Sequence, residues 1–291
     1  MKNSVTLISV PYDSAHFGKR MGAGPRHIIN HGLIEKIQTH RFEVLYKEVL
    51  TKQKFPTEIT TCFELLDLSR EEIIHAKEHR SLPIVLAGNC SGTVGVVAGF
   101  KSNDTGVIWF DAHGDCETPE TTTSGFLDGM GIPLLLNSCW QNLLSSYNLT
   151  SSLTGENIVL IGARDLSKSE EQFIKTNAIK YITVDEIKRS NTQRAKAIFF
   201  DLSSSGIQQV HLHIDVDVFD PAVAHSNSYE VKDGLARHEV LSLINCCMRE
   251  MRVTSVTIAS YDPSFDTDDS MLNLIHELIE TIVVNCNEPN A

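Results

Sequence analysis

Short apolar segments alternate with longer segments of helical periodicity along most of this chain. The apolar segments are continuously hydrophobic, which is typical of strands covered on both faces. The eight predicted strands are Val5–Val10, Phe42–Val49, Pro83–Ala87, Val107–Phe110, Asn157–Ile161, Ala178–Thr183, Val210–Val218 and Ser255–Ala259. The predicted helices are Arg26–Gln38, Glu58–Arg80, Thr93–Phe100, Gly129–Leu149, Glu170–Thr176, Gln193–Ser205, Arg237–Met251 and Met271–Asn285. This alternation predicts a three-layer α/β/α sandwich with an eight-stranded, mainly parallel sheet.

The length and charge of the chain narrow its organisation and its partners. With 291 residues and no repeat or linker, we expect one domain spanning residues 1–291. A net charge of −12 without a basic run argues against nucleic acid or an anionic membrane as partner. Seven scattered cysteines, no signal peptide and no apolar run of membrane length predict a reducing, cytoplasmic location.

Two of the predicted strands end in closely spaced acidic residues. The first is followed by Asp111, His113 and Asp115, and the second carries His213, Asp215 and Asp217. If the backbone stays extended, spacing of two places each set on one face. So many carboxylates repel one another unless cations lie between them. We expect two divalent ions, first of all Mn²⁺, with Fe²⁺, Co²⁺, Ni²⁺ or Zn²⁺ as alternatives, and expect His213 to be a hydrogen-bonded core histidine.

Other polar residues also follow predicted strands. Cys90 comes after the third strand, Asp165 after the fifth and Asp262 after the eighth. Sites in parallel α/β folds gather at the carboxyl ends of the strands. These segments are therefore expected to meet at one site, where Asp165 is a candidate contact for the substrate.

Cys90 admits three interpretations from the residues around it. The segment Gly88–Gly92 fits G-x-C-x-G, the cysteine form of a nucleophile elbow. In that case Cys90 attacks an ester or amide, with Asp217 and either His238 or His276 completing a triad. Alternatively, Cys90 is a thiolate ligand of a metal, or a buried inert thiol.

Several motifs together give the sequence a family resemblance over nearly its whole length. They are Val10–Ser14, Gly22–Pro25, the turn at Gly88, Asp111–Asp115, Thr121–Gly125, Asp215–Pro221 and Gly234–Glu239. With these motifs the sequence resembles the ureohydrolase family, which includes arginase, agmatinase and formiminoglutamase. The fold that the resemblance implies is an arginase-like, eight-stranded parallel sheet between helices, in agreement with the count of strands above.

The resemblance also implies roles for individual residues. One ion would be held by Cys90, Asp111, Asp115 and Asp215, and the other by Asp111, His113, Asp215 and Asp217, so that Asp111 and Asp215 bridge. Glu239 would bind the guanidinium group of the substrate, while Thr122 and Ser124 lie in the loop that holds the amino-acid end in arginases. His225 and His238, in or near the loop before Glu239, are candidates for proton transfer. Because relatives form trimers or hexamers, a homo-oligomer is expected.

The chain departs from the family pattern at four positions. Cys90 stands where the family usually has a histidine, and in this it is similar to a branch that acts on N-hydroxyarginine. Asp128 replaces a histidine that shuttles protons, and an aspartate of ordinary pKa would do this less well near neutrality. Glu117 and Phe126 replace asparagines near the substrate's α-carboxylate. A carboxylate at Glu117 is expected to repel a substrate carboxylate and to favour an amine or a cation.

These observations favour a binuclear metal hydrolase that cleaves a linear C–N bond in a guanidino or amidino compound, releasing urea or hydroxyurea and an amine. Two alternatives remain open. One is an α/β hydrolase with Cys90 as nucleophile, and the other is a catalytically altered ureohydrolase-like protein that binds a ligand without turnover.

Overall fold

Eight strands form one parallel sheet, in the order β4-β1-β5-β10-β9-β6-β7-β8. The structure is a computed structural model, and it describes residues 3–52, 57–100 and 103–286. The strands are β1 Ser4–Val10, β4 Glu43–Glu48, β5 Leu82–Ala87, β6 Thr105–Phe110, β7 Ile158–Ile161, β8 Lys180–Ile182, β9 Gln209–Asp215 and β10 Arg252–Ala259. The predicted fold class is confirmed. The ends of the predicted domain, residues 1–2 and 287–291, lie outside the described residues.

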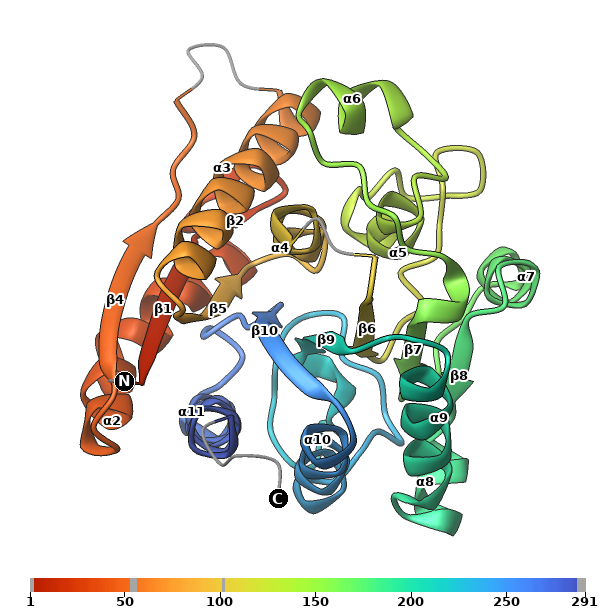
Figure 1. The fold of residues 1–291 in the computed structure, drawn as a ribbon. Coiled ribbons are helices and arrows are strands. Elements are labelled where there is room, and N and C mark those ends of the chain that lie inside the picture. Colours follow the sequence, from red (N-terminus) through yellow and green to blue (C-terminus); the bar gives the residue numbers. More distant parts are fainter. Residues whose placement is uncertain (1–2, 53–56, 101–102, 287–291) are drawn as a thin grey trace.

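The helices cover both faces of this sheet (Figure 1). On one face lie α3 Glu58–Glu78, α4 Gly92–Phe100, α5 Gly131–Leu135 and α6 Gln141–Ser146. On the other lie α1 Gly24–Ile28, α2 Ile34–Thr39, α8 Val184–Ser190, α9 Gln193–Ser204, α10 Arg237–Glu250 and α11 Ser270–Asn285. The helix α7 Lys168–Thr176 lies near the β8 edge. The sheet is therefore the middle of three layers.

The strand β6 shows why the apolar runs are continuous. Ile108 and Phe110 are fully buried in the core on one face of the sheet, together with residues of α9, α10 and α11. Val107 and Trp109 are fully buried in a second core on the other face, together with residues of α4 and α5. Alternate residues of a strand point to opposite faces, so a strand between two cores must be hydrophobic at every position.

Two predicted helices are interrupted in the structure. The predicted helix Gly129–Leu149 is divided into α5 and α6, because the chain turns sharply at Asn137 and Trp140, where φ is +53° and +51°. The predicted helix Arg26–Gln38 contains a break at Gly32, whose φ of +91° lies in the left-handed region that glycine tolerates. Hydrophobic periodicity continued through both breaks and concealed them.

Two elements are absent from the sequence-based prediction. The helix α8 begins with a capping box in which the Thr183 hydroxyl accepts from the Glu186 backbone N–H and the Glu186 side chain accepts from the Thr183 N–H. A two-stranded antiparallel sheet follows β1 in the sequence and is separate from the main sheet. It consists of β2 Tyr12–Asp13 and β3 His16–Phe17. Both elements are short, and short elements give little periodic signal.

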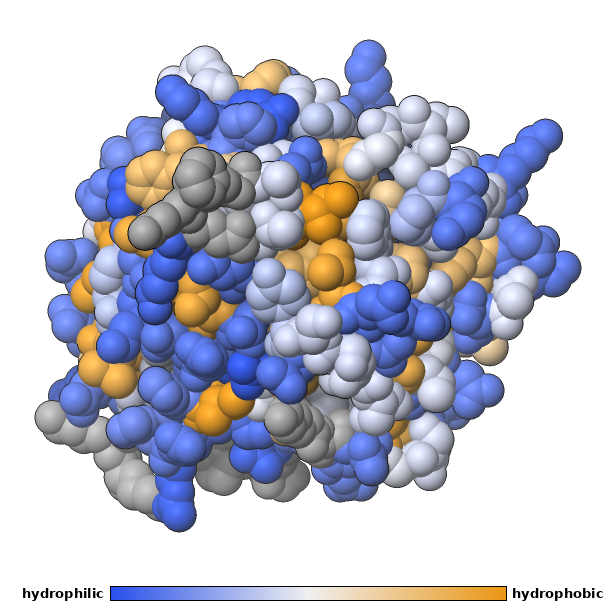
Figure 2. All heavy atoms as spheres, turned by 90° about the horizontal axis from the view of Figure 1, so that it is seen from above, coloured by the Kyte–Doolittle hydropathy of each residue, from blue (hydrophilic) through white to orange (hydrophobic). Residues whose placement is uncertain are grey.

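The described helices and the face drawn in Figure 2 are largely polar on the outside. Within the described ranges, the helices are all too short or too polar to traverse a bilayer. On the face drawn in Figure 2, hydrophilic residues predominate, and hydrophobic residues form small, separate patches.

A buried histidine in α11 makes the stability of the fold sensitive to acid. The Nε2–H of His276 donates to the Ile28 carbonyl at 3.3 Å. Burial lowers the pKa of His276, as do Lys36 and His31, although the hydrogen bond and Glu280 act in the opposite direction. The folded protein therefore binds a proton here at lower pH than the unfolded chain does.

We expect the free energy of unfolding to fall as the pH decreases below about 6.5, the ordinary pKa of histidine. Below this pH the unfolded chain binds the extra proton, so this residue contributes a loss of at most about 1.4 kcal/mol per pH unit. Urea unfolding at pH 7.5 and 5.5 measures the loss. In His276→Gln, which keeps an N–H donor and does not titrate, the loss is expected to be smaller. An equal loss in both proteins would refute this assignment.

Candidate metal centre

A cavity of about 340 Å³ opens at the carboxyl ends of the central strands. Its volume lies in the range of pockets that hold small molecules. The residues that line it are Met21, Cys90, His113, Asp115, Phe126, Asp128, Gly129, Asp165, Leu166, Ser167, Glu170, Asp215, Asp217, Asn227, Tyr229 and Ser260. Segments that follow β5, β6, β7, β9 and β10 therefore meet here, as the strand-end argument predicted.

The acidic residues reach the cavity by turns rather than by extended strands. The strand β6 ends at Phe110, and Asp115 has a φ of +47°. The strand β9 ends at Asp215, and the next three residues form a 3-10 helix, with the Asp217 N–H donating to Asp215 Oδ1 at 2.8 Å. The extended spacing therefore holds for His213 and Asp215, which both lie in β9, but not beyond the ends of β6 and β9. Local turns stabilised by the carboxylates themselves bring them together.

The first cluster of possible ligands consists of Asp111, His113 and Asp217. One ligand atom from each lies within 4.8 Å of the others. The Nδ1 atom of His113 is 3.3 Å from Asp111 Oδ1 and 3.4 Å from Asp217 Oδ2. An imidazole nitrogen between two carboxylates is a donor set that suits a divalent transition metal.

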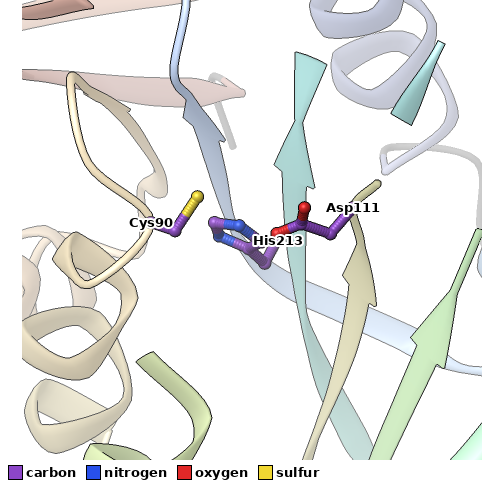
Figure 3. Close-up of side chains that lie close together, drawn as sticks. All are labelled: Cys90, Asp111 and His213. Atoms are coloured by element: carbon purple, nitrogen blue, oxygen red, sulfur yellow. The ribbon is translucent and has the colours of Figure 1, made fainter. Parts of the chain in front are cut away.

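The second cluster consists of Cys90, Asp111 and His213, whose ligand atoms also lie within 4.8 Å of one another. Figure 3 shows these three side chains, with the ring of His213 between the sulfur and the carboxylate. The Cys90 thiol donates to Asp215 Oδ2 at 2.8 Å, so Asp215 adjoins this cluster. Asp111 belongs to both clusters, as expected of a residue that bridges two ions.

The electrostatics of the centre fit bound cations. Burial and the charge of Asp217 raise the pKa values of Asp111 and Asp215, because each carboxylate disfavours ionisation of the other. Burial opposes a charge on His113, but Asp217 and Asp111 outweigh it and raise its pKa. Asp115 Oδ2 is buried and has no hydrogen-bond partner among the described residues. Buried oxygens of this kind need a partner, and a divalent cation would supply it.

The structure does not assemble the cysteine triad. Within the described ranges, Cys90 Sγ makes hydrogen bonds only to Asp215 and Ser260. His276, one of the proposed bases, instead bonds the Ile28 carbonyl, and the other, His238, is exposed on α10. Burial and the charge of Asp215 raise the pKa of the Cys90 thiol well above its ordinary value. A buried, protonated thiol among carboxylates is a poor nucleophile, so the triad prediction is wrong.

Asp128 lies in the wall of the cavity and supports the turn that carries Cys90. Its Oδ1 accepts from the Ser91 backbone N–H at 2.8 Å, and its Oδ2 accepts from Asn89 Nδ2 at 2.9 Å. Burial raises the pKa of Asp128 to about 6, although these hydrogen bonds act in the opposite direction. The assumption of an ordinary pKa for this residue is therefore wrong.

The loop that contains Thr122 and Ser124 lies at the rim. Glu117, at its start, accepts hydrogen bonds from Ser167 Oγ at 2.6 Å and from Ser169 Oγ at 3.3 Å. The hydroxyl oxygens of Thr122 and Ser124 are 3.5 Å apart, and neither residue lines the cavity. The Thr122 hydroxyl accepts from the Gly125 N–H, and the Ser124 hydroxyl accepts from the Phe126 N–H, so both side chains stabilise the loop.

Three further predicted site residues lie outside the two ligand clusters. Asp165 is exposed and lines the mouth of the cavity. Glu239 Oε2 accepts from the Ala236 N–H at 2.7 Å at the start of α10, and Glu239 is not among the lining residues. His225 is exposed and pairs with Glu230 at 2.7 Å. The structure thus groups the predicted metal ligands but leaves Glu239 and His225 outside the lining of the cavity.

Sequence reasoning missed part of the lining. Phe126 stacks on Tyr229, with ring centroids 5.7 Å apart, and both border the cavity. Glu170, Asn227 and Ser260 also line it. Phe126 was among the predicted contacts, but Glu170, Asn227 and Tyr229 lie in loops or at a helix start and belong to no local motif, so the sequence carried no signal for them. Ser260 alone was detectable, because it directly follows a predicted strand.

Comparison with known proteins identifies the relatives of this architecture. The model of the arginase family matches residues 3–284. The chain belongs to the arginase family. It is 31% identical over 283 residues to an arginase of Staphylococcus aureus (strain MRSA252), covering 91% of this chain and 92% of that protein. The crystal structure of Bacillus cereus arginase is similar at 26% identity and a TM-score of 0.86, covering 99% of this chain and 100% of that chain.

The native structure of Bacillus caldovelox arginase has the same fold, with a TM-score of 0.88 at 24% identity and full coverage of both chains. The predicted membership of the ureohydrolase family is confirmed. Arginase-family enzymes are hydrolases of C–N bonds in linear amidines and work with two metal ions, and this chain is a hydrolase of that class. The two ligand clusters that share Asp111 fit such a pair of ions.

Proposed function

We propose that this chain hydrolyses an arginine-like guanidino or amidino compound, such as N-hydroxyarginine, and releases urea or hydroxyurea together with an amine. One observation carries the proposal. Asp111 belongs to two ligand clusters that lie beside a cavity large enough for a small substrate. Two divalent cations held there would supply Lewis acidity and lower the pKa of water, which is the chemistry that hydrolysis of a planar amidine carbon needs.

We propose the family's ligand assignment for the pair of ions, with Mn²⁺ as the first candidate and Fe²⁺, Co²⁺, Ni²⁺ or Zn²⁺ as alternatives. One ion takes Cys90, Asp111, Asp115 and Asp215, and the other takes Asp111, His113, Asp215 and Asp217. The short contact between Cys90 and Asp215 supports the first set, and the His113 contacts support the second. The free Asp115 oxygen is a further argument for a cation beside it.

The charge of the cavity favours a cationic substrate. Asp128, Asp165 and Glu170 line it, and the residues that line it include no lysine or arginine. A cavity lined by one sign of charge concentrates ligands of the opposite sign. A guanidinium group meets this requirement, and we propose that Glu239 and Asp165 help to orient it.

The rim suits a substrate tail that carries an amine better than one that carries only a carboxylate. Glu117 adds a negative charge where an asparagine is usual in the family, and it is joined to the cavity wall through Ser167. Phe126 and Tyr229 offer an aromatic surface for the methylene groups of the tail. We propose that Thr122 and Ser124, in the same loop, contact the end of the tail.

Proton transfer is assigned to Asp128 and His225. Asp128 lines the cavity, and its carboxyl is buried, which brings its pKa to about 6. A group of that pKa exchanges protons readily near neutrality. His225 is exposed, lies two residues before Asn227 of the cavity lining, and pairs with Glu230.

We further propose a single domain over residues 1–291, a homo-oligomer and a cytoplasmic location. The family match to residues 3–284 supports one domain, and the family's general behaviour supports the oligomer. All seven cysteines are free thiols, which is typical of a reducing compartment.

A substrate panel on protein of measured metal content tests the proposed function. The panel comprises arginine, N-hydroxyarginine, agmatine, guanidinobutyrate and formiminoglutamate, each with Mn²⁺, Fe²⁺ or Ni²⁺. We expect hydrolysis of at least one compound, abolished by a chelator and restored by the metal. Agmatine and guanidinobutyrate form a matched pair, because their tails end in an amine and a carboxylate. Glu117 predicts that kcat/KM is about tenfold higher for agmatine, and more nearly equal in Glu117→Gln.

Three results would count against the proposal. Activity that resists chelation would show that bound ions take no part in the reaction. Tight binding of two ions without turnover of any compound in the panel would indicate a binding protein. Absence of bound metal under all three conditions would remove the basis of the proposal.

A further inference from the structure

The side chain of His213 is buried beside the centre but is absent from the ligand sets above. It lies on β9, fully buried, and its strand partner on β6 is Trp109. The two rings stack with centroids 3.7 Å apart and an interplanar angle of 27°. The indole Nε1–H of Trp109 also donates to Asp111 Oδ2 at 2.9 Å. The same tryptophan therefore positions the imidazole of His213 and the carboxylate of Asp111.

A row of hydrogen bonds occupies the other side of the ring. His213 Nδ1 is 2.8 Å from Thr93 Oγ1, which is 3.4 Å from His211 Nε2. His211 Nδ1 is in turn 2.8 Å from Ser255 Oγ. If Nδ1–H of His213 donates to the threonine hydroxyl, that hydroxyl can donate onward to His211. The row thus has one consistent direction, and it leaves a lone pair on His213 Nε2.

No described residue makes a hydrogen bond to His213 Nε2, although the atom is buried. A buried polar atom without a partner is rare in native structures. Its surroundings indicate what is missing, because Cys90 and Asp111 each place a ligand atom within 4.8 Å of a His213 ring nitrogen (Figure 3). A metal-binding histidine characteristically has its second ring nitrogen held by a hydrogen bond, as Nδ1 is here.

We propose that His213 is a ligand of the first metal ion, through Nε2, and completes a Cys90–Asp111–His213 set. This inference rests on the proposed metal-dependent function. The set combines sulfur, nitrogen and oxygen donors, which favours Co²⁺, Zn²⁺ or Fe²⁺ over Mn²⁺. The second set, around His113, keeps three carboxylates and one imidazole. The two metal positions therefore differ in their donor atoms. Thr93 positions the His213 ring at the first of them.

Titration of the metal-free protein with Co²⁺ tests the proposal, since thiolate-bound Co²⁺ absorbs in the near ultraviolet. The wild type is expected to bind two ions and to develop this band. Two variants remove Nε2 differently: His213→Phe keeps the stack on Trp109, and His213→Asn keeps a polar atom near Thr93. In both, we expect at least tenfold weaker binding of one ion and a weaker band. His276→Gln removes a buried imidazole that does not line the cavity; it is the control and is expected to keep both.

A measurement on the wild type does not depend on how the variants fold. The proton NMR spectrum of the Co²⁺ protein is expected to contain two strongly shifted, exchangeable imidazole N–H signals, one from His113 and one from His213. A single signal, or unchanged Co²⁺ affinity and absorption in both His213 variants, would overturn the proposal. Two signals in a protein that hydrolyses nothing in the panel would leave the His213 assignment standing and refute the proposed function.

Discussion

The Asp111→Asn protein is expected to lose both metal ions and to hydrolyse its best substrate on the order of a thousandfold more slowly. Asp111 belongs to both ligand clusters, so one substitution removes a charged donor from each. A thousandfold loss corresponds to about 4 kcal/mol of transition-state stabilisation. Metal content after dialysis and kcat/KM on the preferred compound measure the two effects.

Asp165→Asn is the matched control for metal content. It makes the same chemical change at another carboxylate that lines the cavity, and Asp165 belongs to neither cluster. It is expected to retain two ions. Because burial and Asp217 raise the pKa of Asp111, its charge destabilises the empty site, and the metal-free Asp111→Asn protein is expected to unfold no more easily than the wild type. An Asp111→Asn protein that retains both ions would refute the shared-ligand arrangement.

The fold was largely predictable because the strongest signals lie in the sheet. Strands such as β6 are buried on both faces, which favours a continuous apolar run such as 107–110. Such runs are hard to mistake in this sequence, since helices of ordinary length separate them. The breaks at Gly32 and Trp140 were not predictable from periodicity, because residues on both sides of each break still face the core.

The site was predicted from correct residues with partly wrong geometry. Extended spacing was expected to place the members of each acidic set on one face, whereas Asp217 and His113 are placed by turns beyond the strand ends. His213 was expected to be a core histidine, and its Nδ1 hydrogen bond agrees with that expectation. What the sequence could not show is that a ring nitrogen of His213 lies near Cys90 and Asp111 and that Nε2 has no hydrogen-bond partner among the described residues, since this depends on the register between β6 and β9.

The role of Arg164 was likewise invisible in the sequence, where it is one polar residue after a strand. In the structure its guanidinium group donates to backbone carbonyls from three segments. The acceptors are Gly162 at 3.1 Å, Asp217 at 2.9 Å, Val218 at 3.3 Å, Phe219 at 3.2 Å, Val231 at 2.7 Å and Lys232 at 3.0 Å. Arg164 thereby holds the turn that carries the Asp217 carboxylate.

We expect Arg164→Met to lower the free energy of unfolding by about 3 kcal/mol, because partly buried carbonyls lose charge-assisted hydrogen bonds. Urea unfolding of the metal-free protein in chelator measures this loss without a contribution from metal binding. Since the Asp217 turn loses its anchor, the affinity for the ion beside His113 is also expected to fall.

Arg164→Lys separates the contribution of the guanidinium's several N–H donors from the contribution of its positive charge. Lysine keeps the positive charge but presents its donors at a single point, so it cannot reach acceptors that surround a planar guanidinium. It is expected to recover less than half of the lost stability. If Arg164→Lys unfolds at the same urea concentration as the wild type, charge alone stabilises this region, and the carbonyl contacts do not hold the Asp217 turn.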